Sequence, residues 1–268
     1  MTRRFLWPRE HGAWAMLLLP FLCGVAVAAT ARWESLAALA VILTVFLAQE
    51  PALTLLRQRI VWREAREASR QATWSLCLLL PPAAVAAILL FVRLPWKPLA
   101  ALSGVAAVLM AWRAVFTLSN KQRFVLLQVL EAAGLTSTAL LGYLSARGSL
   151  DRVAWLLWGA FSVHHAAALL VIRARLEAII GSRARTPAER RCRVAAWFGQ
   201  VVLAAVAVWA FLGGNARLGL AFAIPFALHS RDLLLLDSPP FLKIPLTRAG
   251  WREVLISVAF AAVLVSAL

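Results

Sequence analysis

The chain has 268 residues, of which 62% are hydrophobic and 15% are charged, and its mean hydropathy is +0.79. Soluble domains carry about 25% charged residues, so this composition excludes an ordinary soluble protein and predicts an all-α, polytopic membrane protein. The net charge is +16, but the basic residues lie in short segments between apolar runs. This distribution excludes a nucleic-acid-binding surface and is typical of membrane topology signals.

Nine apolar runs predict nine transmembrane helices within a single integral membrane domain, residues 1–268, because a span needs about 20 apolar residues. The eighth run is short and contains Pro225, so a bundle of eight spans is the alternative. The first run is long enough to cross the bilayer and is expected to be a retained helix, not a cleaved signal peptide. The predicted helices, in chain order, are 12–31, 35–56, 72–92, 98–117, 124–146, 153–180, 187–212, 216–230 and 251–268.

The stretch WPREHGAWAMLLLP, residues 7–20, places three ionisable side chains directly before the first apolar run. Arg9 can anchor a helix at the membrane boundary, with Trp7 as an interfacial residue. Anchoring requires only a basic residue, however. Glu10 and His11 therefore either belong to the same anchor or point to the mouth of a cavity.

The distribution of Lys and Arg predicts the orientation of the bundle. With the N-terminus inside, the inner segments carry 21 of the 28 basic residues and the outer loops carry six. This bias places the N-terminus in the cytoplasm. The longest inner loops are expected at about 57–71 and 173–193, after the second and sixth helices.

Two of the acidic residues within the predicted helices, Glu131 and Glu50, lie near inner helix ends and are candidates for a function. Glu131, in the fifth helix, should face the bundle interior, because a carboxylate in hydrocarbon costs about 2.5–3.5 kcal/mol. Arg113 in the fourth helix has a similar depth and is the natural partner, so Glu131 is either part of a structural ion pair or a functional group. Glu50 precedes Pro51 near the end of the second helix, and it is a candidate ligand for a metal or a substrate.

His164 and His165 occupy adjacent positions on the sixth helix and cannot face the same direction. Paired metal ligands on a helix are normally three or four residues apart. We therefore expect one packed histidine and one near a cavity. His11 and His229 lie near the inner edge, so no axial histidine at a matching depth supports a haem site.

Several motifs together resemble the YwiC-like family of bacterial membrane proteins. They are PREHGAWAMLLLP at the N-terminus, the polar turn LSNKQR, Glu131 in the following helix, and VIRARLE at the end of the sixth helix. The resemblance covers nearly the whole chain and implies the bacterial inner membrane, but that family has no settled biochemical role. A more distant resemblance is to the UbiA-type intramembrane prenyltransferases. It implies a nine-helix bundle in which two aspartate-rich motifs, after helices two and six, hold magnesium and a prenyl diphosphate.

The resemblance to the prenyltransferases implies particular site residues. The first motif falls on residues 48–54 and keeps only Glu50, the second falls on residues 173–177 and keeps only Glu177, and Lys121 matches the basic residue after helix four. Because each magnesium ion seeks several oxygen ligands in octahedral geometry, one glutamate per motif is a poor cage. The basic side chains of these loops can instead bind a diphosphate or phospholipid head group directly: Arg57, Arg59, Lys121, Arg123, Arg173 and Arg175.

We therefore expect a UbiA-like cavity that binds, and in an enzyme would transform, a prenylated or other long-chain anionic lipid. The catalytic candidates are Glu50, Glu177 and Glu131, with Glu10 and His11 at the cavity mouth. Magnesium remains a candidate cofactor, although the aspartate-rich motifs are missing. The alternative is a non-catalytic membrane subunit or a transporter, in which Glu131, Arg113 and the histidines form a polar path or a partner interface.

Overall fold

The computed structural model describes residues 5, 11–30, 32–63, 67–119, 125–181 and 187–268. Every regular element in these ranges is a helix, which confirms the predicted all-α class. The elements are α1 His11–Val27, α2 Trp33–Leu56, the π-helical segment η1 Arg57–Trp62, α3 Glu67–Arg93, α4 Trp96–Leu118, α5 Val125–Thr136, α6 Thr138–Arg147, α7 Arg152–Gly181, α8 Pro187–Leu212, α9 Ala216–Leu234, α10 Pro239–Leu242 and α11 Leu246–Ala267.

The surface of this bundle is apolar, as a lipid environment requires. Large side chains such as Val92, Leu212 and Trp251 are more than 70% exposed, a degree of exposure that is stable in hydrocarbon and costly in water. Seven helical segments of the described chain are long and apolar enough to cross a membrane, and α1 is a shorter apolar helix. The protein is therefore a multi-pass membrane protein, whereas the count of nine spans stays a prediction.

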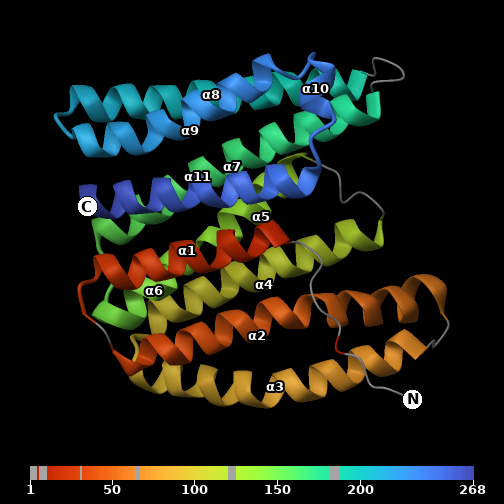
Figure 1. Cartoon of the computed structure of the whole chain (residues 1–268). Coiled ribbons are helices and arrows are strands. Elements are labelled where there is room, and N and C mark those ends of the chain that lie inside the picture. Colours follow the sequence, from red (N-terminus) through yellow and green to blue (C-terminus); the bar gives the residue numbers. More distant parts are fainter. Residues whose placement is uncertain (1–4, 6–10, 31, 64–66, 120–124, 182–186) are drawn as a thin grey trace.

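The long helices lie side by side with their axes roughly parallel, and successive connections alternate between two ends of the bundle (Figure 1). One end is where α2, α4, α7 and α9 finish and α3, α5, α8 and α11 begin. We call it the basic end, because it corresponds to the inner segments in which Lys and Arg are concentrated. The candidate residues in the two predicted long loops belong to this end.

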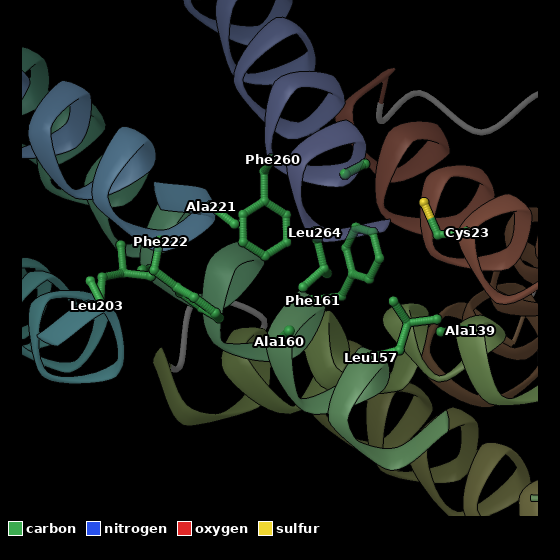
Figure 2. Packing of buried hydrophobic residues seen from close by; sticks show 13 residues of the cluster. Cys23, Ala139, Leu157, Ala160, Phe161, Leu203, Ala221, Phe222, Phe260 and Leu264 are labelled. Carbon is green, nitrogen blue, oxygen red and sulfur yellow. The ribbon is translucent and has the colours of Figure 1, made fainter. Parts of the chain in front are cut away.

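Helix α1 packs between two groups of helices. The first group is α5 and α6, and the second group is α7 and α11. Its Cys23 belongs to a buried apolar cluster with Ala139 of α6, Phe161 of α7 and Phe260 of α11 (Figure 2). The first apolar run is thus a central helix of the bundle.

The expected single helix at 124–146 is divided in the structure into α5 and α6. Three consecutive hydroxyl side chains donate to carbonyls three residues back: Thr136 to Ala133 (3.1 Å), Ser137 to Gly134 (2.6 Å) and Thr138 to Leu135 (3.0 Å). Such local bonds compete with the helical ladder and bend it. The hydroxyl of Thr138 also donates to the Leu17 carbonyl of α1 at 2.7 Å, which fixes this bend against the central helix.

In the described residues, the segments at 57–71 and 173–193 are largely helical, and their place in the cytoplasm stays a prediction. The π-helical segment η1 prolongs α2 until Arg63, whose left-handed backbone (φ 51°) ends it, and α3 already begins at Glu67. Buried Gln58 accepts a hydrogen bond from Ser69, which folds this extension against α3. At the second position α7 continues to Gly181 and α8 begins at Pro187, the glycine stop and proline start that the sequence indicates.

Glycines at the α1–α6 contact set the separation of these two helices. A Cβ atom added at Gly24 would overlap the carbonyl oxygen of Ala139, and one at Gly142 would overlap that of Phe21. Small residues allow such close backbone approach between membrane helices. We predict that Gly142→Ala lowers the free energy of unfolding by about 1–3 kcal/mol, because the backbones must separate.

The measurement is thermal unfolding of the purified protein in detergent. Gly104→Ala in α4 is the matched control, because an added Cβ there meets nothing within 4 Å. This control should be neutral or stabilising, since alanine is the better helix former. Equal melting temperatures for the wild type and Gly142→Ala would contradict the close contact.

Asp151 caps α7 at the end opposite the basic end. Its Oδ1 accepts from the backbone N–H of Val153 (2.9 Å) and of Ala154 (3.3 Å), and its Oδ2 accepts from the Tyr143 hydroxyl at 2.6 Å. The hydrogen bond from Tyr143, together with those two backbone donors, holds the pKa of the Asp151 carboxyl below its ordinary value of 3.8. The ionised carboxylate is therefore the form that the fold stabilises.

We predict that Asp151→Ala lowers the free energy of unfolding by about 1 kcal/mol, the usual cost of a lost N-cap. The pKa of Asp151 is lower in the folded protein than in the unfolded chain. The part of the stability that depends on the Asp151 charge is therefore fully present above the ordinary pKa and is lost as the pH falls through the folded pKa. Melting curves from about pH 6 to about pH 3 would test this. Asp151→Asn should flatten the acid dependence, and an unchanged acid dependence in Asp151→Asn would contradict the assignment.

Candidate functional site

Three polar side chains from different helices meet inside the bundle near its basic end. The Arg113 Nε of α4 lies 3.6 Å from the Glu131 Oε1 of α5, and the Arg113 Nη1 donates to the Gln49 Oε1 of α2 at 3.4 Å. The amide of Gln49 in turn contacts the sulfur of Met110 at 3.3 Å. The ion pair between Arg113 and Glu131 is the one that the sequence predicts.

This polar group lies below the helix ends, within the apolar part of the bundle. Gln49, Arg113 and Glu131 are between five and seven residues from the nearest ends of α2, α4 and α5. At 1.5 Å per residue they lie roughly 8–10 Å along these helices. Pairing is the expected solution at such a depth, since an isolated charge there is costly.

The polar group forms one end of a cavity of about 570 Å³ between α1, α2, α4, α5 and α6. The remainder of the lining is mainly apolar, including Leu17 and Phe46, with three hydroxyl side chains among it: Ser103, Ser137 and Thr138. Along α4 the lining runs from Leu99 to Arg113, which is about 21 Å. The cavity is therefore a long apolar chamber with its charged group close to the basic end.

Helix α4 separates this cavity from the surroundings of the bundle. It packs lightly against α2, α3 and α5, and its other face exposes Val105, Val108 and Val115 to the surroundings. The side toward the cavity carries the small residues Ala106 and Ala107. A displacement of α4 would therefore open the cavity laterally to the bilayer.

The arginines predicted after helix two lie outside this cavity lining. Arg57 is half-buried in η1, and Arg59 is exposed. Glu50, a predicted metal or catalytic residue, is half-buried on α2 next to Gln49 but does not line the cavity. Gln49, the residue before Glu50, does line the cavity. The sequence analysis did not single it out.

The predicted residues at the end of α7 are engaged with one another and with the α10 segment. Arg173 pairs with Glu177 at 2.8 Å. Arg175 is buried, donates to the carbonyls of Phe241 (3.1 Å) and Ile244 (2.7 Å), and lies 4.6 Å from the centroid of the Phe241 ring. In this arrangement Arg175 holds the segment between α10 and α11 against α7.

The remaining predicted site residues lie outside the described part of the chain. Glu10, Lys121 and Arg123 belong to this group, and for His11 only the backbone is described, as the first residue of α1. Among the side chains that are described, no group of three or more His, Cys, Asp or Glu residues could hold a metal ion. Glu50 and Glu177 are therefore not joined by further ligands of this kind.

A second buried polar cluster lies between α7, α9 and α11, and the sequence analysis missed it. His164 and His229 stack with ring centroids 6.1 Å apart. The Nε2 of His164 lies 3.1 Å from the Ser257 hydroxyl, and the Nε2 of His229 lies 2.9 Å from a carboxylate oxygen of Glu253. The available signal was Glu253 in an apolar helix, which requires a partner.

We call His164, His229, Ser257 and Glu253 the histidine cluster. It ends against phenylalanine side chains. His164 stacks on Phe260 at 4.3 Å and His165 stacks on Phe161 at 5.8 Å. These phenylalanines belong to the buried cluster of Figure 2, whose described members are apolar apart from the thiol of Cys23. The histidine cluster thus extends from Glu253 to the middle of the bundle, where it meets the apolar cluster.

We predict that Glu253→Ala lowers the free energy of unfolding by about 1–3 kcal/mol, because it leaves the fully buried His229 without its partner. Glu253→Gln should cost less, since the amide can still form a hydrogen bond with the ring. Thermal unfolding in detergent would measure both changes. Arg248→Ala, an exposed change at the same end, is the control, and equal losses for the two Glu253 variants would contradict this role.

Comparison with known proteins identifies a family for this chain. A family model described as YwiC-like protein matches residues 7–143, which is just over half of the 268 residues, so the chain belongs to the YwiC-like protein family. No curated protein and no solved structure gives a significant match. The predicted YwiC-like membership is confirmed, and the more distant resemblance to the prenyltransferases stays a prediction.

Proposed function

We propose that this member of the YwiC-like family binds a prenylated or other long-chain anionic lipid in the cavity between α1, α2, α4, α5 and α6. Ligand cavities are typically about 300–1,000 Å³, mostly apolar, with a few polar groups that fix orientation. The cavity of about 570 Å³ has this composition, with the polar groups gathered at one end. That arrangement suits an amphiphile whose tail is long and whose head is small.

One observation carries the proposal. All the residues that line the cavity in the described chain, from Leu17 to Leu141, fall within the segment matched by the family, residues 7–143. The histidine cluster at His164, His229 and Glu253 falls outside it. The cavity is therefore built from the part of the chain that characterises the family.

Arg113 is the group that would hold the lipid head. Its guanidinium can form two parallel hydrogen bonds to a phosphate or carboxylate, while its contact with Glu131 runs through Nε at 3.6 Å. A bound anion would share or replace Glu131 as the partner of Arg113. Among the described residues, Glu131 is also the only carboxylate of the cavity lining, so it is the group that could exchange a proton with a bound lipid.

The cavity lining does not suit magnesium. A magnesium ion needs octahedral oxygen coordination and is usually held by carboxylates together with substrate phosphates. Here the described part of the lining offers one carboxylate, which already faces a guanidinium at 3.6 Å. Direct recognition by arginine is therefore the binding mode that these residues support.

The transport alternative has less support from the described residues. Transport of an ion needs polar groups that continue from one face of the membrane to the other. Beyond Arg113 and Glu131 the described cavity lining holds only hydroxyl groups among apolar side chains, and the histidine cluster stops at Phe161 and Phe260. We place the basic end in the cytoplasm, because 21 of the 28 basic residues fall on that side.

We predict that wild-type protein, purified in mild detergent, retains a long-chain lipid that is not part of the bulk phospholipid, as identified by lipid extraction and mass spectrometry. Arg113→Gln should reduce its retention about tenfold, since a charge-assisted hydrogen bond contributes about 1.5–3 kcal/mol. Ala107→Phe should reduce it by filling the cavity from α4.

Arg152→Gln is the matched control, because Arg152 is exposed at the other end of the bundle. It should leave retention unchanged. Recovery of bulk phospholipid alone from the wild type, or unchanged retention in Ala107→Phe, would overturn the proposal.

A further inference from the structure

A second apolar hollow lies on the outside of the bundle, between α5, α7 and α8. It has a volume of about 870 Å³, and its lining includes the small residues Ala166, Ala167 and Gly199. Gly199 lies directly against Ala167, because a Cβ added there would be 3.3 Å from the Ala167 Cα. The close approach of α7 and α8 at these small residues produces the hollow, which we call the α7–α8 groove.

The basic end of the α7–α8 groove is occupied by two adjacent arginines. Arg190 and Arg191 lie in the first turns of α8, line the groove and are exposed. Their neighbour Arg193 pairs with Asp237 at 2.8 Å and with Glu189 at 3.3 Å. Arg190 and Arg191 have no ion pair with any described residue.

The length of the α7–α8 groove matches one leaflet of a bilayer. Its lining on α8 runs from Arg190 to Val202, which is about 18 Å at 1.5 Å per residue. Half of a hydrocarbon core of about 30 Å is about 15 Å. A lipid with its phosphate at the arginines would therefore lay one acyl chain along the whole groove and reach the bilayer centre.

We propose that the α7–α8 groove is a binding site for one anionic phospholipid of the leaflet at the basic end. Two guanidinium groups favour a head group with a net negative charge, because the ammonium of a zwitterionic head would be repelled by them. The small residues of the floor accept an acyl chain without rearrangement. This site is separate from the internal cavity, shares no lining residue with it, and does not depend on the proposed function.

The test uses the full-length protein, delipidated in detergent and then titrated with either dioleoylphosphatidylglycerol or dioleoylphosphatidylethanolamine, with bound lipid counted by native mass spectrometry. The wild type should bind phosphatidylglycerol at least about tenfold more tightly than phosphatidylethanolamine, because both lipids offer the phosphate but only phosphatidylethanolamine places an ammonium beside the two guanidinium groups. The double variant Arg190→Gln and Arg191→Gln should lose this preference. Equal affinity of the wild type for the two lipids would overturn the proposal.

Steric and charge controls separate this site from general attraction to a basic protein. Ala166→Phe on α7 and Ala195→Phe on α8 fill the groove from either side and should each reduce phosphatidylglycerol binding. Arg248→Gln removes an exposed charge at the same end and should have no effect. If Arg248→Gln weakens binding as much as the double variant does, or if neither phenylalanine weakens it, the groove is not the site.

The cavity variants make the two lipid sites distinguishable. Arg113→Gln and Ala107→Phe should leave phosphatidylglycerol binding at the α7–α8 groove intact, whatever they do to the lipid retained inside. Loss of phosphatidylglycerol binding in these two variants, with full binding in the arginine double variant, would assign the anionic lipid to the cavity and refute the groove. A groove that instead holds a second copy of the chain would show dimers of the wild type and no lipid selectivity.

Discussion

The cost of an unpaired charge in hydrocarbon is the constraint on which this bundle depends. Several ionisable side chains that contact the interior are matched to a partner on another element, and these contacts hold the helices together. Arg113 joins α4 to α5 through Glu131, His229 joins α9 to α11 through Glu253, and Arg175 holds the turn after α10. Because each of these three contacts connects different elements, they contribute to the arrangement of the helices as well as to their stability.

The same constraint explains why α1 is central. The helix has no charged residue after His11 and carries the small residues that allow close contact. Gly24 meets α6 through Ala139, and Thr138 of α6 donates to the carbonyl of Leu17. A helix without charges needs no partner of opposite sign. Helix α1 can therefore pack against α5 and α6 and also against α7 and α11.

Composition and periodicity predict the helices of this chain well and its tertiary pairs poorly. The ends at Gly181 and Pro187 follow from local glycine and proline chemistry, and the Arg113–Glu131 pair follows from equal depth. The histidine cluster could not be derived, because His229 meets His164 only through the packing of α9 against α7. Likewise the role of Arg175 depends on carbonyls about 70 residues away along the chain, and no sequence pattern records that contact.

Charge balance distinguishes the two apolar hollows. The polar end of the cavity contains one cation and one anion, so it is close to neutral before a ligand arrives, and an anionic head must compete with Glu131 for Arg113. The described lining of the α7–α8 groove has two arginines and no carboxylate. An abundant anionic phospholipid would therefore favour the groove, whereas the cavity would select for the length and shape of the apolar chain.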